Sequence, residues 1–146
     1  MPHRNPPDTE IRQLLASATT IAVVGASSNP ERPSNSVMRR MQQLGYRVIP
    51  VNPNETQVLG ETAYASLADV PIAIDIVDVF RRAEYTPAVA DDAVKVHAKT
   101  LWLQQGVWNE EAAARAKAGG LTVIMDACIA VELTVLQVPV PAHRRP

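Results

Sequence analysis

The chain has 146 residues, of which 47% are hydrophobic and 20% charged, and these values are typical of one ordinary globular domain. Its formal net charge of −1 excludes a general electrostatic attraction to nucleic acid or to a membrane surface, so any anion site has to be local. A single cysteine, Cys128, excludes an intramolecular disulfide framework and a multi-cysteine metal site.

The two ends of the chain differ in composition from the part between them. Residues 1–7 are polar and proline-rich, without the apolar stretch of a secretory signal, and we expect them to form an N-terminal arm. Residues 8–138 are expected to form a single domain, and residues 139–146 a flexible tail. No apolar run approaches the roughly 18 residues of a membrane span, so we expect a soluble cytoplasmic protein without nucleic-acid or membrane partners.

Short apolar runs alternate with helical patterns along the domain. Runs of β-branched and other apolar residues predict strands at 21–24, 46–51, 72–80, 99–106 and 121–126. Apolar residues three and four positions apart predict helices at 8–18, 34–44, 83–97, 110–118 and 129–136. Pro87 fits only a first turn, so the third helix is expected to start as late as Thr86. Asp8 and Asn109 are expected to cap helices, and Gly45 to end one in the left-handed conformation.

The strands are continuous apolar runs, and no hairpin dipeptide lies between them. This pattern favours a parallel sheet covered by helices on both faces. Residues 52–71 are expected to form an irregular connection with a turn at 52–55 and a short helix at 66–69. The predicted fold is a single doubly wound α/β domain with a five-stranded parallel sheet, in which ligands bind beyond the carboxyl ends of the strands.

The loop after the first strand, GASSNPERPS, carries the groups of an anion site. Gly25 permits a tight turn that a side chain would block, and the following helix points free N–H groups and its positive dipole end back at the loop. Hydroxyl donors and a fixed positive charge lie in the same segment, at Ser27, Ser28, Ser34 and Arg32. The alternative is a polar connection in which Ser34 or Asn35 caps the helix.

The dinucleotide fingerprint G-x-G-x-x-G is incomplete in this loop, because Gly25 is followed by no second or third glycine. In NAD-binding folds the second strand ends at an acidic residue that binds the ribose hydroxyl, but this chain has Asn52 and Pro53 there. Both observations argue against NAD and leave room for a phosphorylated adenosine.

The third and fourth strands also end in candidate ligand groups. Arg81 and Arg82 follow the third strand, and at least one is expected to point toward a phosphate. Phe80 either packs against a ligand or is a core aromatic residue, and both interpretations stay open. Gln104 and Gln105 precede Gly106 at the end of the fourth strand, so amide and backbone groups are expected to approach a ligand closely there.

Five segments taken together resemble the small stand-alone CoA-binding proteins, which are similar to the N-terminal CoA-binding domain of the succinyl-CoA synthetase α subunit. The segments are TIAVVGASSNPERPSNSVMRRM, GYRVIPVNPNE, VDVFRRAE, KTLWLQQGV and MDACIAVEL. The resemblance covers residues 19–133. It implies a Rossmann-like fold that binds coenzyme A.

The resemblance also implies where each part of coenzyme A lies. The adenosine and pyrophosphate would lie against the first loop, at Gly25, Ala26, Ser27 and Ser28, and against the start of the following helix. The turn at Asn52 and Pro53 would face the adenosine. The nucleotide would be flanked by Val79, Phe80 and Arg81, and the pantetheine by Leu103, Gln104 and Gly106.

No catalytic constellation is visible in the sequence, which leaves open whether the protein is an enzyme and favours binding without catalysis. His97 is expected near a helix end in a structural role, and His3 and His143 lie in the terminal segments. Asp75 and Asp78 are three positions apart, which is the wrong period for one face of a strand. We expect both to lie at a strand edge, in solvation or capping roles.

Three functions therefore stay open. The favoured one is a coenzyme A or acyl-CoA binding protein that acts as a carrier, buffer or sensor. An NAD(P)-type enzyme is disfavoured because the fingerprint glycines and the acidic residue after the second strand are missing. A regulatory interaction module with a vestigial site is disfavoured because the loops at the ligand edge are intact. Cys128 follows the fifth strand, and we hypothesise that it forms a mixed disulfide with the ligand thiol.

Overall fold

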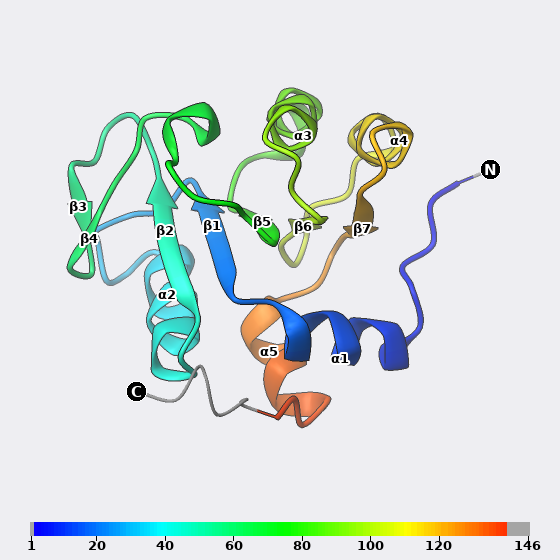
Figure 1. The fold of residues 1–146 in the computed structure, drawn as a ribbon, viewed down its shortest axis with the longest axis horizontal. Coiled ribbons are helices and arrows are strands. Elements are labelled where there is room, and N and C mark those ends of the chain that lie inside the picture. Colours follow the sequence, from blue (N-terminus) through cyan, green and yellow to red (C-terminus); the bar gives the residue numbers. More distant parts are fainter. Residues whose placement is uncertain (1, 140–146) are drawn as a thin grey trace.

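The computed structural model describes residues 2–139 and contains a five-stranded sheet in the order β2-β1-β5-β6-β7 (Figure 1). In that order the strands are Arg47–Val51, Thr20–Val24, Ile76–Val79, Thr100–Leu103 and Thr122–Ile124. All neighbouring pairs are parallel. The predicted doubly wound α/β fold is confirmed, and the strand order reverses between β1 and β5.

Helices cover both faces of this sheet (Figure 1). On one face lie α3 (Thr86–Lys95) and α4 (Glu110–Ala118). On the other face lie α1 (Asp8–Ser17), α2 (Pro33–Gln43) and α5 (Ile129–Val135). None of the helices in the described part of the chain is long and apolar enough to cross a bilayer.

Side chains that alternate along the central strands supply the two cores. In β1, Ile21 and Val23 belong to the core beneath α1, α2 and α5, whereas Ala22 and Val24 belong to the core beneath α3 and α4. All four side chains are buried. Because every residue of such a strand faces one core or the other, the strand has an unbroken apolar sequence.

Most predicted helix ends are confirmed, and one is wrong. Asn109 caps α4, since its side chain accepts a hydrogen bond of 2.8 Å from the backbone N–H of Ala112. Gly45 follows α2 with φ +89°, and α3 begins at Thr86 after a 3-10 turn at Ala83–Tyr85. Asp8 is not a cap, because Pro7 occupies the cap position and Asp8 is the first residue of α1. There its carboxylate lies at the positive end of the helix dipole.

A short antiparallel hairpin forms within the predicted irregular connection. Its strands are β3 (Gln57–Val58) and β4 (Glu61–Thr62), and they pair around Leu59 and Gly60. These two residues have φ +49° and +83°, as two-residue hairpin turns with a mirror-image backbone require. The hairpin is not signalled in the sequence, because leucine rarely adopts positive φ and Leu-Gly is therefore not a hairpin dipeptide. The short helix is confirmed as a 3-10 turn at Leu67–Asp69.

Three of the predicted strands are shorter in the structure. The strand predicted at 72–80 contains only Ile76–Val79, and the last two strands end at Leu103 and Ile124. At the start of the sheet, the Asp75 carboxylate accepts hydrogen bonds from the backbone N–H groups of Thr19 (2.8 Å) and Thr20 (3.0 Å). The predicted capping role of Asp75 is therefore confirmed.

Residues 2–7 form no helix or strand but are tied to the domain by hydrogen bonds. The backbone N–H of His3 donates to Glu110 of α4 at 2.8 Å. The Asn5 amide donates to the carbonyl oxygen of Met125 at 2.7 Å and accepts from the N–H of Met125 at 2.9 Å. His3 is buried and its ring lies 5.6 Å from that of Trp108. His143 and most of the predicted tail lie outside the described residues.

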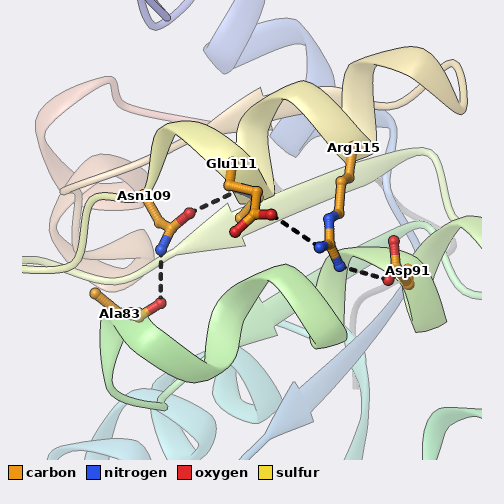
Figure 2. A network of polar contacts seen from close by, with 6 residues as sticks. Ala83, Asp91, Asn109, Glu111 and Arg115 are labelled. Atoms are coloured by element: carbon orange, nitrogen blue, oxygen red, sulfur yellow. Dashed lines mark hydrogen bonds and ion pairs between the residues drawn. The ribbon is translucent and has the colours of Figure 1, made fainter.

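Polar contacts join α3 and α4 on the outer surface (Figure 2). The Asn109 amide donates to the carbonyl oxygen of Ala83 at 2.9 Å. Arg115 donates to Asp91 at 2.7 Å and to Glu111 at 2.9 Å. Exposed ion pairs of this kind contribute about 0.2–1 kcal/mol each. The contact between the two helices therefore depends mainly on the apolar packing beneath them.

Gly119 lets α4 approach α3 closely. A Cβ atom at this position would lie 2.4 and 2.6 Å from the two methyl carbons of Val94. Val94 is β-branched, so its side chain is restricted in χ1 and does not rotate away easily. The backbone of Gly119 has an ordinary φ of −86°, so the position requires glycine for space rather than for conformation.

We expect Gly119→Ala to lower the free energy of unfolding by about 1–3 kcal/mol, the usual cost of overpacking. Gly120→Ala is the matched control, because Gly120 has φ +88° but open space around an added Cβ, so only a strain of about 1 kcal/mol is expected. Urea denaturation measures both. Val94→Ala should recover stability in the Gly119→Ala background and not in the Gly120→Ala background; recovery in neither would contradict the steric explanation.

Candidate functional site

A cavity of about 690 Å³ opens at the carboxyl ends of the strands, beside the point where the strand order reverses. Residues from the ends of β1, β2, β5 and β6 and from the start of α2 line it. Its volume lies within the usual range of small-molecule sites, about 300–1,000 Å³. The position agrees with the general rule for ligand sites in doubly wound sheets.

Gly25 joins the ends of β1 and β5 at this point. Its φ is +88°, and a Cβ atom would lie 2.4 Å from the carbonyl oxygen of Phe80. The N–H of Phe80 donates to the carbonyl oxygen of Val24 at 2.8 Å, which fixes the same contact. The expected tight turn at Gly25 is confirmed by its φ, but the group that a side chain would strike is the backbone of Phe80.

Two asparagine side chains hold the loop after β1. The Asn52 amide donates to the carbonyl oxygen of Ala26 at 2.8 Å, and the Asn35 amide donates to that of Ser27 at 2.9 Å. Asn52 also accepts from the N–H of Asn54 at 2.9 Å, which forms the predicted turn. An aspartate at position 52 would lack the donor to Ala26, so this position requires an amide for the loop itself.

The start of α2 faces the cavity without a side-chain cap. Arg32 occupies the cap position and makes no capping hydrogen bond. The alternative in which Ser34 or Asn35 caps the helix is wrong, because both are inside the first turn and buried. Ser34 lines the cavity. The positive end of the helix dipole favours an anion at such a position.

The cavity is electropositive although the whole chain has a net charge of −1. Arg32, Arg81 and Arg82 line it, and no aspartate or glutamate does so among the described residues. None of the three arginines forms an ion pair within residues 2–139. The Arg81 guanidinium lies 5.0 Å from the centre of the Tyr85 ring, a cation–π contact that keeps its charge available.

The structure brings most of the expected site residues together. Eight of them line the cavity: Gly25, Ser27, Arg32, Ser34, Asn52, Phe80, Arg81 and Gln104. Six do not: Ala26, Ser28, Pro53, Val79, Leu103 and Gly106.

Those that do not line the cavity have other environments. Ala26, Val79 and Leu103 are fully buried in the cores. Ser28 is exposed and donates to Glu55 through its backbone N–H (2.6 Å) and its hydroxyl (3.0 Å). These residues support the loops that form the cavity, and direct contact with a ligand is expected mainly from the other eight.

Three of the remaining six lining residues, Pro33, Val37 and Val107, are absent from the expected groups, and the other three, Arg82, Gln105 and Cys128, are expected at strand ends. Val37 lies one helical turn after Ser34, and this spacing is a signal that could have placed both on one face. Arg82, Gln105 and Cys128 each follow a predicted strand, so the rule of the carboxyl edge also applies to them. For Cys128 the expected position at the ligand edge is confirmed, and the mixed disulfide stays a prediction.

The structure places Asp78 away from its expected position. It is fully buried in the middle of the sheet, with Val23 of β1 and Trp102 of β6 beside it in register. The expectation of a strand-edge role is therefore wrong. Burial raises the pKa of Asp78 to about 8, and a hydrogen bond from the Gln104 amide opposes the rise. Its Oδ2 atom has no hydrogen-bond partner among the described residues.

Asp75 shows the opposite behaviour at the other end of the sheet. Burial raises its pKa, but hydrogen bonds from the backbone of Thr20 and Thr19 and the nearby Lys99 lower it, and the net effect is a lowered pKa. No group of three or more His, Cys, Asp or Glu side chains among residues 2–139 is placed to hold a metal ion.

The raised pKa of Asp78 predicts a pH-dependent loss of stability. Between the ordinary value of 3.8 and about 8, the unfolded chain releases this proton and the folded protein keeps it. The free energy of unfolding should therefore fall as pH rises through this window, by up to roughly 1.4 kcal/mol per pH unit.

Asp78→Asn removes this contribution, so its unfolding free energy should depend less steeply on pH between 4 and 8. Asp75→Asn is the control, because the lowered pKa of Asp75 acts only in acid, where stability is lost as pH falls. Urea denaturation at a series of pH values measures both. Parallel curves for the wild type and Asp78→Asn would contradict the buried neutral carboxyl.

Comparison with known proteins identifies a matching family and several similar proteins. A family model described as CoA binding domain matches residues 19–134. The uncharacterized protein YneT of Bacillus subtilis (strain 168) is 47% identical over 128 residues, which is 88% of this chain and 95% of YneT. The structure of a hypothetical protein from Pyrococcus horikoshii OT3 aligns with a TM-score of 0.89 and 36% identity, over 94% of this chain and 99% of that one.

A longer relative has a named activity. Acetate–CoA ligase (ADP-forming) II of Archaeoglobus fulgidus is 27% identical over 94 residues, which is 63% of this chain but only 14% of the ligase. The chain therefore corresponds to one part of that protein. Since the family model matches most of the chain, the predicted resemblance is confirmed and the protein belongs to the CoA binding domain family.

Proposed function

We propose that this protein binds coenzyme A or an acyl-CoA in the cavity at the carboxyl edge of the sheet. The observation that carries the proposal concerns residues 2–139 of a chain of the CoA binding domain family: within them the cavity is lined by three arginines without ion pairs and by no carboxylate. Coenzyme A carries a pyrophosphate and a ribose phosphate, so it needs such concentrated positive charge. The acyl group and the pathway that the protein serves are left open.

The phosphate groups fit best near the start of α2. Arg32 and Ser34 line the cavity there, and the helix has no side-chain cap to compete for its N–H groups. Arg81 and Arg82 approach from the end of β5. Arginine forms paired hydrogen bonds with phosphate oxygens, and a helix N-terminus adds its dipole. Two elements that are far apart in sequence thus supply one anion site.

The rest of the cavity suits a chain of mixed polarity. Val37, Phe80 and Val107 supply apolar surface, while Gln104 and Gln105 supply amide groups. The pantetheine arm of coenzyme A alternates methylene groups with two amides, so it needs both kinds of contact. We therefore place the arm toward β6 and the adenosine toward the Asn52 turn.

The proposed role is binding without catalysis, as a carrier, buffer or sensor of coenzyme A. The ligase activity of the Archaeoglobus fulgidus relative belongs to a protein of which this chain matches only 14%, so that activity is not part of the proposal. A cytoplasmic location stays a prediction.

Calorimetric titration with coenzyme A, NAD and NADP tests the proposal. We expect binding of coenzyme A in the micromolar range and no comparable signal for either dinucleotide. Binding of NAD or NADP alone would instead support a dinucleotide enzyme. No binding by any of the three would support an interaction module with a vestigial site.

The arginines provide a sharper test. We expect Arg32→Ala and Arg81→Ala each to weaken coenzyme A binding by roughly tenfold or more, because a charge-assisted hydrogen bond contributes about 1.5–3 kcal/mol. Arg47→Ala is the matched control, since Arg47 is exposed at the start of β2, at the end of the strand away from the cavity. Equal affinities for all three variants would place the ligand outside this cavity.

A further inference from the structure

Asp78 lies directly beneath the cavity. It is separated by one residue from Phe80, which lines the cavity, and its side chain faces the core shared with α2 and α5. The residue is fully buried, and Oδ2 has no hydrogen-bond partner among the described residues. A buried polar atom without a partner is costly, so its retention inside a sheet needs a reason.

Gln104 connects Asp78 to the cavity. It is 6% exposed and lines the cavity, and its Nε2 donates to Oδ1 of Asp78. No described residue donates to its Oε1, so in this arrangement Oε1 is the polar atom of the pair that is open to a ligand. The two side chains form one unit, because Gln104 is the one hydrogen-bond partner of the Asp78 carboxyl within residues 2–139.

The charged and titratable groups on the surrounding elements do not set the state of Asp78. At the cavity they are Arg32, Arg81, Arg82 and Cys128, and on the helices of the same face they are Asp8, Glu10 and Arg12 of α1, Arg39 and Arg40 of α2, and Glu132 of α5. Burial raises the pKa of Asp78 and the Gln104 hydrogen bond lowers it, and no charge contributes. The group therefore responds mainly to its amide partner and to what occupies the cavity.

Each ionisation state of Asp78 forms its hydrogen bond with a different end of the Gln104 amide, either the Nε2 donor or the Oε1 acceptor. An ionised carboxylate only accepts hydrogen bonds, so it holds Nε2 and leaves Oε1 toward the cavity. A neutral carboxyl has a buried O–H that needs an acceptor, and Oε1 of Gln104 is the acceptor within reach. Turning the amide over satisfies that O–H and presents the Nε2 donor to the cavity instead.

We propose that Asp78 and Gln104 form a proton-linked pair beneath the ligand site, in which the ionisation of Asp78 determines which end of the Gln104 amide faces a bound ligand. Asp78 is thus a positioning residue that acts through Gln104. The inference rests on the proposed function for its ligand, although the pair itself exists without one.

An anionic ligand should couple to this pair. A second negative charge above a buried carboxylate is unfavourable, so bound coenzyme A favours the neutral form of Asp78. By linkage, binding near pH 8 takes up protons, and affinity falls above that pH by up to about tenfold per pH unit. In the neutral state the Nε2 donor faces the ligand and suits a carbonyl or phosphate oxygen.

The first experiment needs no ligand. Carbon-13 NMR of the Asp78 carboxyl and proton–nitrogen NMR of the Gln104 side-chain amide are followed against pH. We expect both signals to change together near pH 8, and the change at Gln104 to disappear in Asp78→Asn. A carboxyl that titrates below pH 5, or a Gln104 amide that does not respond to Asp78, would overturn the inference.

The second experiment measures the link to the ligand. Titration of the protein with coenzyme A at pH 8, in two buffers of different ionisation enthalpy, gives the number of protons taken up. We expect greater uptake in the wild type and in Asp75→Asn, which changes a carboxyl outside the cavity, than in Asp78→Asn. Subtraction of the value for the variant removes protons that belong to the ligand.

The outcomes separate the inference from the proposed function. Binding of coenzyme A with the same proton uptake in the wild type and Asp78→Asn would overturn the inference and leave the proposed function intact. Absence of binding would contradict the proposed function, and the ligand-free NMR titration would still decide the inference.

Discussion

The contact between Gly25 and the carbonyl oxygen of Phe80 fixes the geometry on which the rest of the site depends. These residues end β1 and β5, the two strands between which the sheet reverses direction. Any Cβ atom at position 25 would push the two strand ends apart, because it would lie 2.4 Å from that oxygen. The start of α2 and the arginines after β5 face each other only because this junction is closed.

One glycine is therefore enough in this loop, and the reason lies in the protein rather than in a ligand. In a full dinucleotide fingerprint, further glycines permit close approach of a pyrophosphate and of the following helix. Here the one glycine, Gly25, permits the close approach of its own backbone to that of Phe80. The side-chain amides of Asn52 and Asn35 bind the carbonyl oxygens of the next two loop residues. The proposed anion site then relies on side chains and the helix start, which need less space.

Sequence reasoning predicted the parts of the molecule that depend on local pattern. The parallel sheet and its helices follow from periodicity, and the first loop follows from Gly25 and the polar residues after it. It did not predict the hairpin, because Leu59 adopts a backbone conformation that leucine rarely takes. It also placed Asp78 at an edge, because burying a charged residue type inside a strand is energetically costly. The hydrogen bond that accommodates Asp78 comes from Gln104, which is 26 residues away in the sequence.

The N-terminal segment has a consequence for the edges of the sheet. Asn5 exchanges two hydrogen bonds with the backbone of Met125, just after the edge strand β7, and so imitates the pairing of a further strand. At the opposite edge, Tyr64 bonds to the carbonyl oxygen of Pro50 and to the N–H of Asn52, and Pro50 has no N–H to offer. Unpaired edges are where sheets of separate molecules join and aggregate. Both edges of this sheet are thus partly closed by short segments of the same chain, so fewer backbone groups are left there to pair with a strand of another molecule.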